Sequence, residues 1–415
     1  MCGLGLDVHL GGKLDSRQFS KRDYDNERSI KSELGPLLLL TCIFFLNFIA
    51  RIILAPLMPT IEKDLGIGHA EAGSLFLLIS AGYFISLLGA GFLSSRLTHR
   101  RTIIVSATAV GMSLLGVSLS NSLWAMRFAL FMLGIAAGTY LPSGIATLTS
   151  LISSRHWGKG LAIHEFAPNL SFVAAPLITE ALLMWSSWRA ILALLGVTSV
   201  VVGIAFSRFG RSGQFPGEAP SLSSFKTFLI MPVFWIMAVL FGLGISSSLG
   251  VYTMLPLYLV TERGMERNWA NTLVALSRVS GLGMAFLAGW TADRFGPKRT
   301  MGRVLLLTGV MTVLLGLLSG YWLVLIIFMQ PMLAVCFFPP GFSALSRIGP
   351  PSARNVIVSL TIPVAFLLGG GAIPMMIGVL GDAGFFALGM AIVGGLILTG
   401  FVLSLYLKMP NNRTT

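Results

Sequence analysis

The sequence predicts an all-α membrane protein with twelve transmembrane helices arranged as two parallel six-helix repeats. Composition is the first reason. Of 415 residues, 55% are hydrophobic and 11% are charged, whereas a soluble domain carries about 25% charged residues. The mean hydropathy is +0.83. These values exclude a soluble globular protein, a disordered chain and a fibrous chain. The other reasons are the number of long apolar runs and an internal repeat.

Twelve apolar runs fill most of the chain, and their lengths suit the ~20 residues that a helix needs to cross a bilayer. Each run is expected to be helical, because backbone N–H and C=O groups in lipid must bond within their own segment. The predicted helices lie at about 37–58, 72–94, 103–120, 124–150, 160–182, 188–207, 227–260, 269–292, 302–318, 321–345, 355–379 and 384–406.

Lysine and arginine predict the orientation. With the amino terminus inside, 22 of the 29 basic residues fall in inside segments and four fall outside. Cytoplasmic loops collect these residues, so we expect both termini in the cytoplasm and the protein in the cytoplasmic membrane. The same bias accounts for the net charge of +13 without a nucleic-acid partner. Three cysteines give neither a disulfide framework nor a metal-binding spacing.

The longest polar stretch within the membrane region is 208–226, and its glycine, proline and serine content is typical of a linker. It divides the chain into a cytoplasmic tail (1–35), a six-helix bundle (36–207), the linker, a second bundle (227–407) and a short tail (408–415).

The two bundles contain related segments, which indicates an internal repeat. Residues 90–102 read AGFLSSRLTHRRT and residues 288–300 read AGWTADRFGPKRT. Parallel repeats of this kind are built around a substrate site between the halves.

The second of these segments resembles the loop signature of the major facilitator superfamily. The first segment is a degraded copy, with Ser95 and Thr98 where aspartate and glycine are usual. The resemblance implies transport by alternating access, in which two bundles rock about a central site. The signature residues are Gly289, Asp293, Arg294, Gly296, Lys298 and Arg299, and the partial copy retains Gly91, Arg96, Arg100 and Arg101.

The signature also has a physical interpretation. A carboxylate at Asp293, near a helix end and beside basic residues, can pair with a base or a helix amino terminus in one rocking state only. We therefore expect the two loops to gate the conformational change. The alternative is that they only anchor the chain by positive charge.

A narrower resemblance is to the organic anion:proton symporters of the superfamily. It rests on Leu46 to Arg51, on Pro59 to Gly66 and on Gly82-Tyr83. Ala50 stands where that branch usually has an aspartate. The helix at 160–182 lacks the Gly-Pro signature of drug antiporters, which argues against efflux.

Two arginines at mid-depth are the main candidates for binding. Ionisable groups inside membrane helices mark functional sites by default, and Arg51 and Arg278 come from different halves. A guanidinium offers a carboxylate or phosphate parallel N–H donors and a permanent charge. The alternative is a structural pairing with carbonyls or a buried carboxylate. Arg127 lies near a helix end and can extend to the interface.

Proton coupling requires a titratable group whose ionisation responds to burial. Glu165, which follows His164, is the stronger candidate, and Glu180 lies nearer the outer helix end. A structural pairing of Glu165 with Arg155 or Lys159 is the alternative. Further polar candidates for the substrate cavity are Asn47, Tyr83, Tyr140, Asn169, Tyr252 and Gln330.

The sequence predicts a secondary transporter that moves a small anionic metabolite by alternating access, with proton symport. The alternatives are a proton-driven efflux antiporter of amphipathic compounds and a transporter-like receptor without transport. No P-loop, nucleophile triad or metal-ligand cluster occurs in the sequence, so we expect no enzyme activity, metal or cofactor. The expected partners are a small-molecule substrate, the proton and the bilayer, around a monomer.

Overall fold

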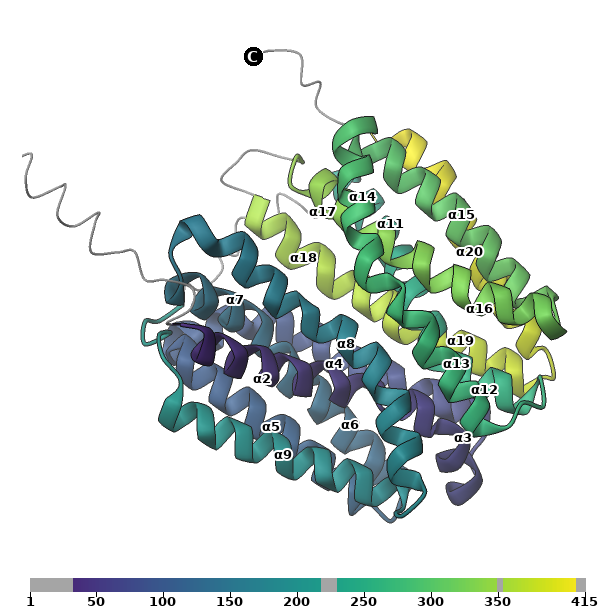
Figure 1. The fold of residues 1–415 in the computed structure, drawn as a ribbon, viewed down its shortest axis with the longest axis horizontal. Helices are drawn as coiled ribbons and strands as arrows, with labels where there is room; N and C mark the ends of the chain where they lie inside the picture. The colour runs from purple at the N-terminus through teal and green to yellow at the C-terminus, as the bar shows by residue number, and fades with distance from the viewer. Residues whose placement is uncertain (1–32, 218–229, 349–353, 408–415) are drawn as a thin grey trace, which may run out of the picture.

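A computed structural model describes residues 33–217, 230–348 and 354–407 of the chain. Helices dominate these ranges (Figure 1). The predicted tails at 1–35 and 408–415 lie outside the described residues except for 33–35. The linker is described only as far as Gly217.

The amino-terminal half contains six spans, two of which are interrupted. The first span is broken at Ile53 and the fourth at Thr139. The helices of this half are α2 (Leu34–Ile52), α3 (Leu54–Leu65), α4 (His69–Arg96), α5 (His99–Ser118), α6 (Leu123–Gly138), α7 (Tyr140–Leu151), the short η1 (Ser154–His156), α8 (Trp157–Leu183) and α9 (Trp188–Phe209).

The carboxyl-terminal half repeats this pattern, with π-helical segments inside two spans. These are η2 (Ser246–Gly250) and η5 (Leu367–Ala372). The other helices are α11 (Pro232–Ile245), α12 (Val251–Thr261), α13 (Arg267–Val279), α14 (Gly281–Phe295), α15 (Pro297–Leu317), α16 (Gly320–Ala334), η3 (Val335–Phe337), α17 (Phe338–Leu345), α18 (Arg354–Phe366), α19 (Ile373–Asp382) and α20 (Phe386–Tyr406).

Within the described ranges, eleven helical segments are long and apolar enough to cross a membrane, and α13 with α14, bent by 40°, is a twelfth if the pair is counted as one span. Each predicted run falls on one of these spans, so the twelve-helix, all-α prediction is confirmed. The first span extends to Leu65, beyond the predicted end at 58. The extension places charged residues such as Glu62 inside a helix rather than in a loop.

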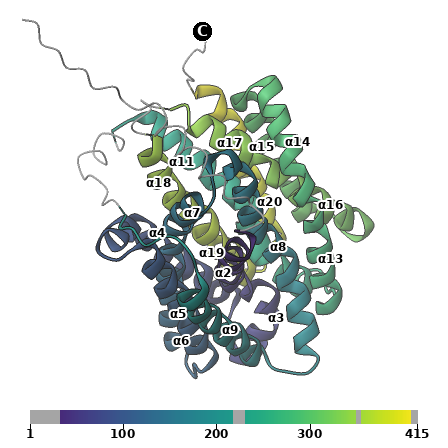
Figure 2. The same ribbon diagram turned by 60° about the vertical axis from the view of Figure 1, so that its left-hand side comes forward.

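The two halves lie side by side and meet mainly at one end (Figure 1). The main contacting pairs are α4 with α19, α8 with α13, and α3 with α12, and α4 also contacts η5 and α18. We call this end, which carries the connections 66–68, 262–266 and 383–385, the Asp382 end. Within the amino-terminal half, α2 and α8 are neighbours (Figure 2). The opposite end carries the connections at 97–98 and 210–217 and is called the linker end.

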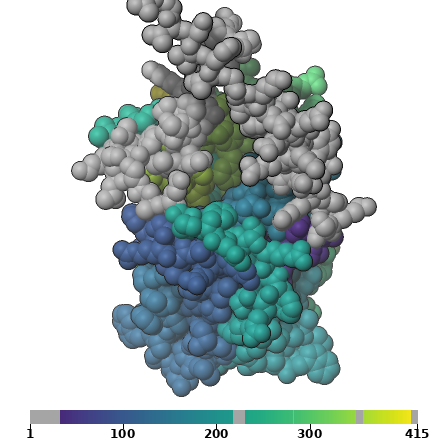
Figure 3. Space-filling model, turned by 90° about the vertical axis from the view of Figure 1, so that its left-hand side faces the viewer, coloured from purple at the N-terminus to yellow at the C-terminus, as the bar shows by residue number. Residues whose placement is uncertain are grey.

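The described part of the linker is fastened to the amino-terminal half. The backbone N–H groups of His99 and Arg100 donate to Phe215 and Gly213, and Gly217 donates to Ser94. In the space-filling view of the linker end, the teal and blue surfaces of these segments adjoin (Figure 3). The linker therefore begins as an ordered strap across the end of one bundle.

Candidate functional site

Arg51 and Arg278 are buried in the centre of the molecule. Their exposed fractions are 7% and 8%. Each occupies the last turn of a helix, α2 for Arg51 and α13 for Arg278. Carbonyl groups at a helix carboxyl terminus carry a partial negative charge that favours a cation. This position favours a cation, although neither arginine has a carboxylate partner among the described residues.

Aromatic rings surround the Arg51 guanidinium. Its central carbon lies 4.3 Å from the ring centroid of Tyr83, 4.7 Å from that of Phe48 and 5.7 Å from that of Phe366. The faces of such rings attract cations. Phe366 belongs to the carboxyl-terminal half, so the cage around Arg51 is built by both halves.

Arg278 has a similar environment. Its guanidinium lies 4.7 Å from the ring of Phe172 and 4.8 Å from the ring of Tyr252. One N–H group donates to the carbonyl of Ser248, in the π-helical segment η2, at 2.9 Å. The ring of Phe172 also contacts Phe48 at 5.2 Å. A continuous chain of aromatic rings therefore connects the two arginines.

A pocket lies beside Arg51, between the two halves. Arg51 is the one charged residue among those that line this pocket. The π-helical segments contribute Leu249 and Gly370 to its wall, and interruptions of this kind recur at functional sites. The lining residues are Phe48, Arg51, Ile52, Phe76, Ile79, Ser80, Tyr83, Leu249, Thr253, Phe366 and Gly370.

Neither arginine forms an ion pair within the described ranges. The Nε atoms of Arg51 and Arg278 are buried and have no hydrogen-bond partner there. Aromatic rings surround the Arg51 guanidinium, and no carboxylate of the described ranges pairs with it. Because an ionised group buried without a partner is unfavourable, this arrangement is suited to bind an anion that enters the pocket.

His164, Glu165 and Tyr140 form a second cluster. Tyr140 and His164 are fully buried, and the Tyr140 hydroxyl lies 3.0 Å from His164 Nε2 and donates to the Leu40 carbonyl at 2.9 Å. His164 Nδ1 lies 3.3 Å from a Glu165 carboxylate oxygen. The side chain of Glu165 is 55% exposed, so the cluster reaches from the bundle interior to its surface.

The amide side chains predicted to face the cavity bond to the protein backbone. Asn47 donates to the Ala137 carbonyl at 3.1 Å and Asn169 donates to the carbonyl of Glu165 at 3.0 Å. Gln330 donates to the Ser247 carbonyl at 2.7 Å. None of the three lines the Arg51 pocket. Of the predicted cavity residues, Arg51 and Tyr83 line that pocket together, and Tyr252 lies against Arg278.

Glu180 and Arg127 belong to the Asp382 end. Glu180 pairs with Arg267 at 3.1 Å and accepts a hydrogen bond from Asn271 at 2.6 Å. Arg127 lies 3.4 Å from Glu71. Glu180 therefore joins α8 to α13 across the two halves and does not neutralise Arg278.

The two copies of the signature loop differ in their contacts. Asp293 is exposed and, within the described ranges, makes no hydrogen bond or ion pair. Its neighbours Arg294 and Lys298 contact Trp290 and the Leu405 carbonyl. In the other copy, Arg100 donates to the Ser207 carbonyl and its segment holds the linker. The copy that lacks the aspartate is thus a docking point for the linker.

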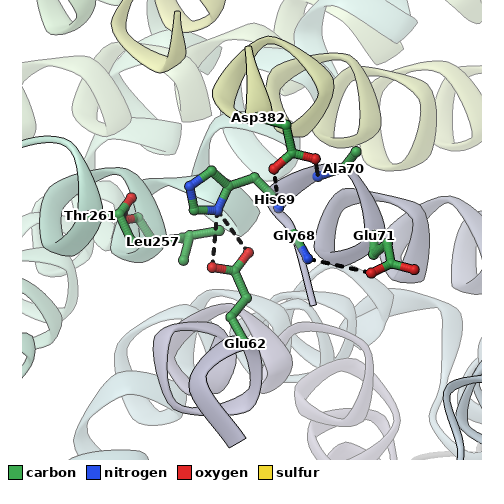
Figure 4. A network of polar contacts seen from close by, with 8 residues as sticks. All are labelled: Glu62, Gly68, His69, Ala70, Glu71, Leu257, Thr261 and Asp382. Carbon is green, nitrogen blue, oxygen red and sulfur yellow. Dashed lines mark hydrogen bonds and ion pairs between the residues drawn. The ribbon is translucent and has the colours of Figure 1, made fainter. Parts of the chain in front are cut away.

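Sequence reasoning missed a polar network at the Asp382 end (Figure 4). Asp382, at the end of α19, accepts hydrogen bonds from the N–H groups of His69 (2.7 Å) and Ala70 (3.0 Å) at the start of α4. Glu62, in α3, lies 2.9 Å from His69 Nδ1. We call Glu62, His69 and Asp382 the Asp382 latch. Asp382 caps a helix of the opposite half, which favours an ionised carboxylate.

A glycine seam lies next to the latch. A Cβ atom added at Gly378 would collide with the His69 carbonyl, and one at Gly73 would lie 2.6 Å from the Pro374 carbonyl. The absence of side chains lets α4 and α19 touch through their backbones. The Asp382 end is therefore closed by a polar cap and by close helix packing. In the described part of the chain, no group of three metal-ligating side chains occurs.

The described chain forms two helical bundles with a pocket between them, and comparison with known proteins gives its family. A family model described as Major Facilitator Superfamily matches residues 40–290, which is more than half of the chain. The chain belongs to the Major Facilitator Superfamily. It is an integral, multi-pass membrane protein and a transporter of small solutes.

Several relatives share 22–23% of their residues with this chain. The membrane sensor protein UhpC of Escherichia coli K12 is 23% identical, with 69% of each chain covered. The multidrug resistance protein MdtL of Klebsiella pneumoniae is 22% identical, with 78% of this chain and 86% of MdtL covered. NarK2 of Mycobacterium tuberculosis, named for nitrate/nitrite transport, is 23% identical, with 66% of this chain and 70% of NarK2 covered.

Solved structures show the same fold. A crystal structure of a bacterial homologue of the human lysosomal transporter Spinster, inward-facing and occupied, superposes with a TM-score of 0.78, 15% identity, and 89% of this chain and 95% of that chain covered. A point mutant of the nucleoside transporter NupG gives a TM-score of 0.73, 13% identity, and coverage of 90% and 99%.

Proposed function

We propose that this protein is a secondary transporter that moves a small anion by alternating access, with proton symport. The observation that carries the proposal is the Arg51 pocket. A buried guanidinium faces a pocket built by both halves, and no carboxylate of the described ranges pairs with it. A site between two rocking bundles is the position from which a substrate can be exposed to either side in turn.

The electrostatics of the pocket favour an anion over a cation or a neutral solute. A cation would be repelled by Arg51, and a neutral solute would leave the charge uncompensated. Among the relatives, the name of NarK2 refers to nitrate and nitrite, which are small anions. That name supports the anion class without fixing the substrate.

The hydrogen bonds of His164 support a proton-binding role. If the Tyr140 hydroxyl gives its single proton to the Leu40 carbonyl, then His164 Nε2 must donate to the hydroxyl oxygen. The contact between Nδ1 and Glu165 then also needs a proton, carried either by the imidazole or by the carboxyl group. His164 and Glu165 are thus two adjacent titratable side chains joined to a buried hydroxyl, which supports their choice as the proton-binding pair.

Purified protein in proteoliposomes tests the transport proposal. We expect Arg51→Ala and Arg278→Ala each to raise the apparent dissociation constant for a transported anion at least tenfold, because a charge-assisted hydrogen bond contributes about 1.5–3 kcal/mol. Arg→Lys should restore only part of the loss. Arg303→Ala, an exposed arginine outside the pocket, is the control. Unchanged affinity in both the Arg51→Ala and the Arg278→Ala variant would contradict the proposal.

A receptor without transport is the second candidate. It is favoured by the similarity to UhpC, which is named as a membrane sensor. The same proteoliposomes separate the two candidates. A receptor would bind the anion with the same dependence on Arg51 but would show neither uptake nor counterflow exchange.

A further inference from the structure

We infer that Phe172 and Phe366 are positioning residues for the two buried arginines, and that each ring holds the arginine of the opposite half in this closed conformation. This inference rests on the proposed alternating access, and it names the contacts through which the arginines respond to the arrangement of the two halves. It follows from a pattern of contacts that occurs twice between the halves.

The arginines and the phenylalanine rings are exchanged between the halves. Arg51 lies in α2, and its guanidinium carbon is 5.7 Å from the ring centroid of Phe366, in α18 of the carboxyl-terminal half. Arg278 lies in α13, and its guanidinium carbon is 4.7 Å from the ring centroid of Phe172, in α8 of the amino-terminal half. Helices α8 and α18 both belong to the fifth span of their halves. The exchange of side chains therefore follows the internal repeat.

A tyrosine completes each of these contacts. The ring centroid of Tyr83 lies 5.1 Å from that of Phe366. The ring centroid of Tyr252 lies 4.8 Å from that of Phe172. Each tyrosine comes from the same half as the arginine that it contacts. We call the two groups the arginine triads, which are Arg51 with Tyr83 and Phe366, and Arg278 with Tyr252 and Phe172.

The phenylalanine can leave an arginine triad when the halves move, whereas the tyrosine stays with its arginine. Bundles that rock about a central site move largely as rigid bodies, so contacts within a half persist and contacts between halves change. A buried cation loses a favourable partner when a ring is withdrawn from it. The triads should therefore favour the present conformation over one that is open at the Asp382 end. An aliphatic side chain in place of either phenylalanine should shift the equilibrium toward the open conformation.

Spin labels at Lys63 and Ala383, in a cysteine-free background and without added substrate, measure the opening of the Asp382 end. We expect Phe172→Leu and Phe366→Leu each to raise the ratio of open to closed molecules roughly two- to thirtyfold, which corresponds to the loss of one cation–π contact. Phe241→Leu is the matched control, because the Phe241 ring is buried and packs within the carboxyl-terminal half. The ratio should not change in the control.

The dependence on arginine separates a cation–π contact from ordinary packing. In the Arg278→Met background, which lacks the charge, Phe172→Leu should cause no further change in the ratio. A ring with a purely structural role would cause the same change with or without the arginine. Phe366→Leu in the Arg51→Met background repeats the test at the other triad.

Trifluorophenylalanine at position 172 or 366 keeps the test decisive if a leucine variant fails to fold. Fluorination weakens the negative charge on the ring face and closely preserves the size of the ring, so it should also raise the ratio. Equal effects with and without the arginines, or no effect of either replacement, would overturn the inference and leave the transport proposal intact. A single distance in every variant, including Gly378→Ala, with and without added anions, would overturn the inference together with alternating access.

Discussion

At the scale of single residues, Glu165 lies at the surface of the amino-terminal bundle, with a side chain that is 55% exposed. Its carboxylate contacts His164, and His164 contacts the buried hydroxyl of Tyr140. The imidazole is also stacked on the Phe44 ring at 4.3 Å, which fixes its orientation. If this exposed side chain faces water, a proton can enter and leave through Glu165 while the imidazole stays in place.

Glu165→Gln should abolish accumulation driven by a pH gradient and retain counterflow exchange. Glutamine keeps a polar contact with His164 but cannot take up a proton, so coupling is lost while the substrate pocket is unaltered. Uptake and exchange are measured in proteoliposomes with and without a pH gradient. Glu266→Gln, at an exposed position before α13, is the control. Full accumulation by Glu165→Gln would move the proton site elsewhere, first to Glu180 or His164.

The candidate site was predictable from the sequence where a residue type was unusual for its surroundings. Arg51 and Arg278 are conspicuous because guanidinium groups are rare in apolar runs. The sequence could not show whether Asn47 and Gln330 face the substrate cavity, because a polar side chain in a helix can equally bond a neighbouring backbone carbonyl. His69, Glu62 and Asp382 were missed because each lies near a run boundary, where charged residues are ordinary.

At the scale of helices, glycine determines how closely the two halves approach. Gly378 on α19 and Gly73 on α4 allow backbone contact beside the Asp382 latch. Within the carboxyl-terminal half, the π-helical segments η2 and η5 also meet through glycine: a Cβ atom at Gly250 would collide with the Gly369 carbonyl. Hydrophobic periodicity carries no signal for a π-helical interruption, so the sequence did not predict these segments.

Gly378→Ala should open the Asp382 end. The added methyl group would collide with the His69 carbonyl, so α4 and α19 must separate and Asp382 must withdraw from the start of α4. Spin labels at Lys63 and Ala383, in a cysteine-free background, should show a longer mean distance in the variant. Gly395→Ala, where a Cβ atom meets nothing within 4 Å, should leave the distance unchanged. An unchanged distance in Gly378→Ala would show that the seam is not required for closure.

At the scale of the whole molecule, the halves are in contact at the Asp382 end and the pocket lies between them. The fold followed from the sequence because apolar length, positive loops and a repeated motif all describe the same architecture. The sequence did not predict which end of the molecule is closed, since a protein that alternates between two conformations has two packings of similar stability. Which end is closed depends on contacts such as the Asp382 latch. These contacts join residues that are far apart in the sequence, so the sequence alone did not predict them.

Orientation in the membrane is predicted by the basic residues. The linker end should face the cytoplasm, so this conformation is closed to the outside. Reporter fusions after Gly66, at the Asp382 end, and after Gly217, at the linker end, should report opposite compartments. The same compartment for both fusions would contradict the predicted topology.

The signature aspartate and the latch aspartate should bias the conformational equilibrium in opposite directions. Asp293 has no partner among the described residues and is exposed, whereas Asp382 caps α4 at the closed end. If Asp293 gains its partner when the linker end closes, Asp293→Asn should favour the present state and slow exchange while substrate binding is retained. Asp382→Asn should weaken the present state, because an amide is a poorer acceptor for the two N–H groups.

Spin labels at Ser154 and Ser346, which are exposed at the linker end, measure this equilibrium. A lost charge-assisted contact of about 1.5–3 kcal/mol changes the ratio of the two states roughly ten- to a hundredfold. Asp293→Asn should therefore increase the population with a long distance between these labels, and Asp382→Asn should decrease it. If Asp293→Asn changes neither the distances nor the exchange rate, the signature loop serves only as a positive anchor, and closure of the linker end must depend on other contacts.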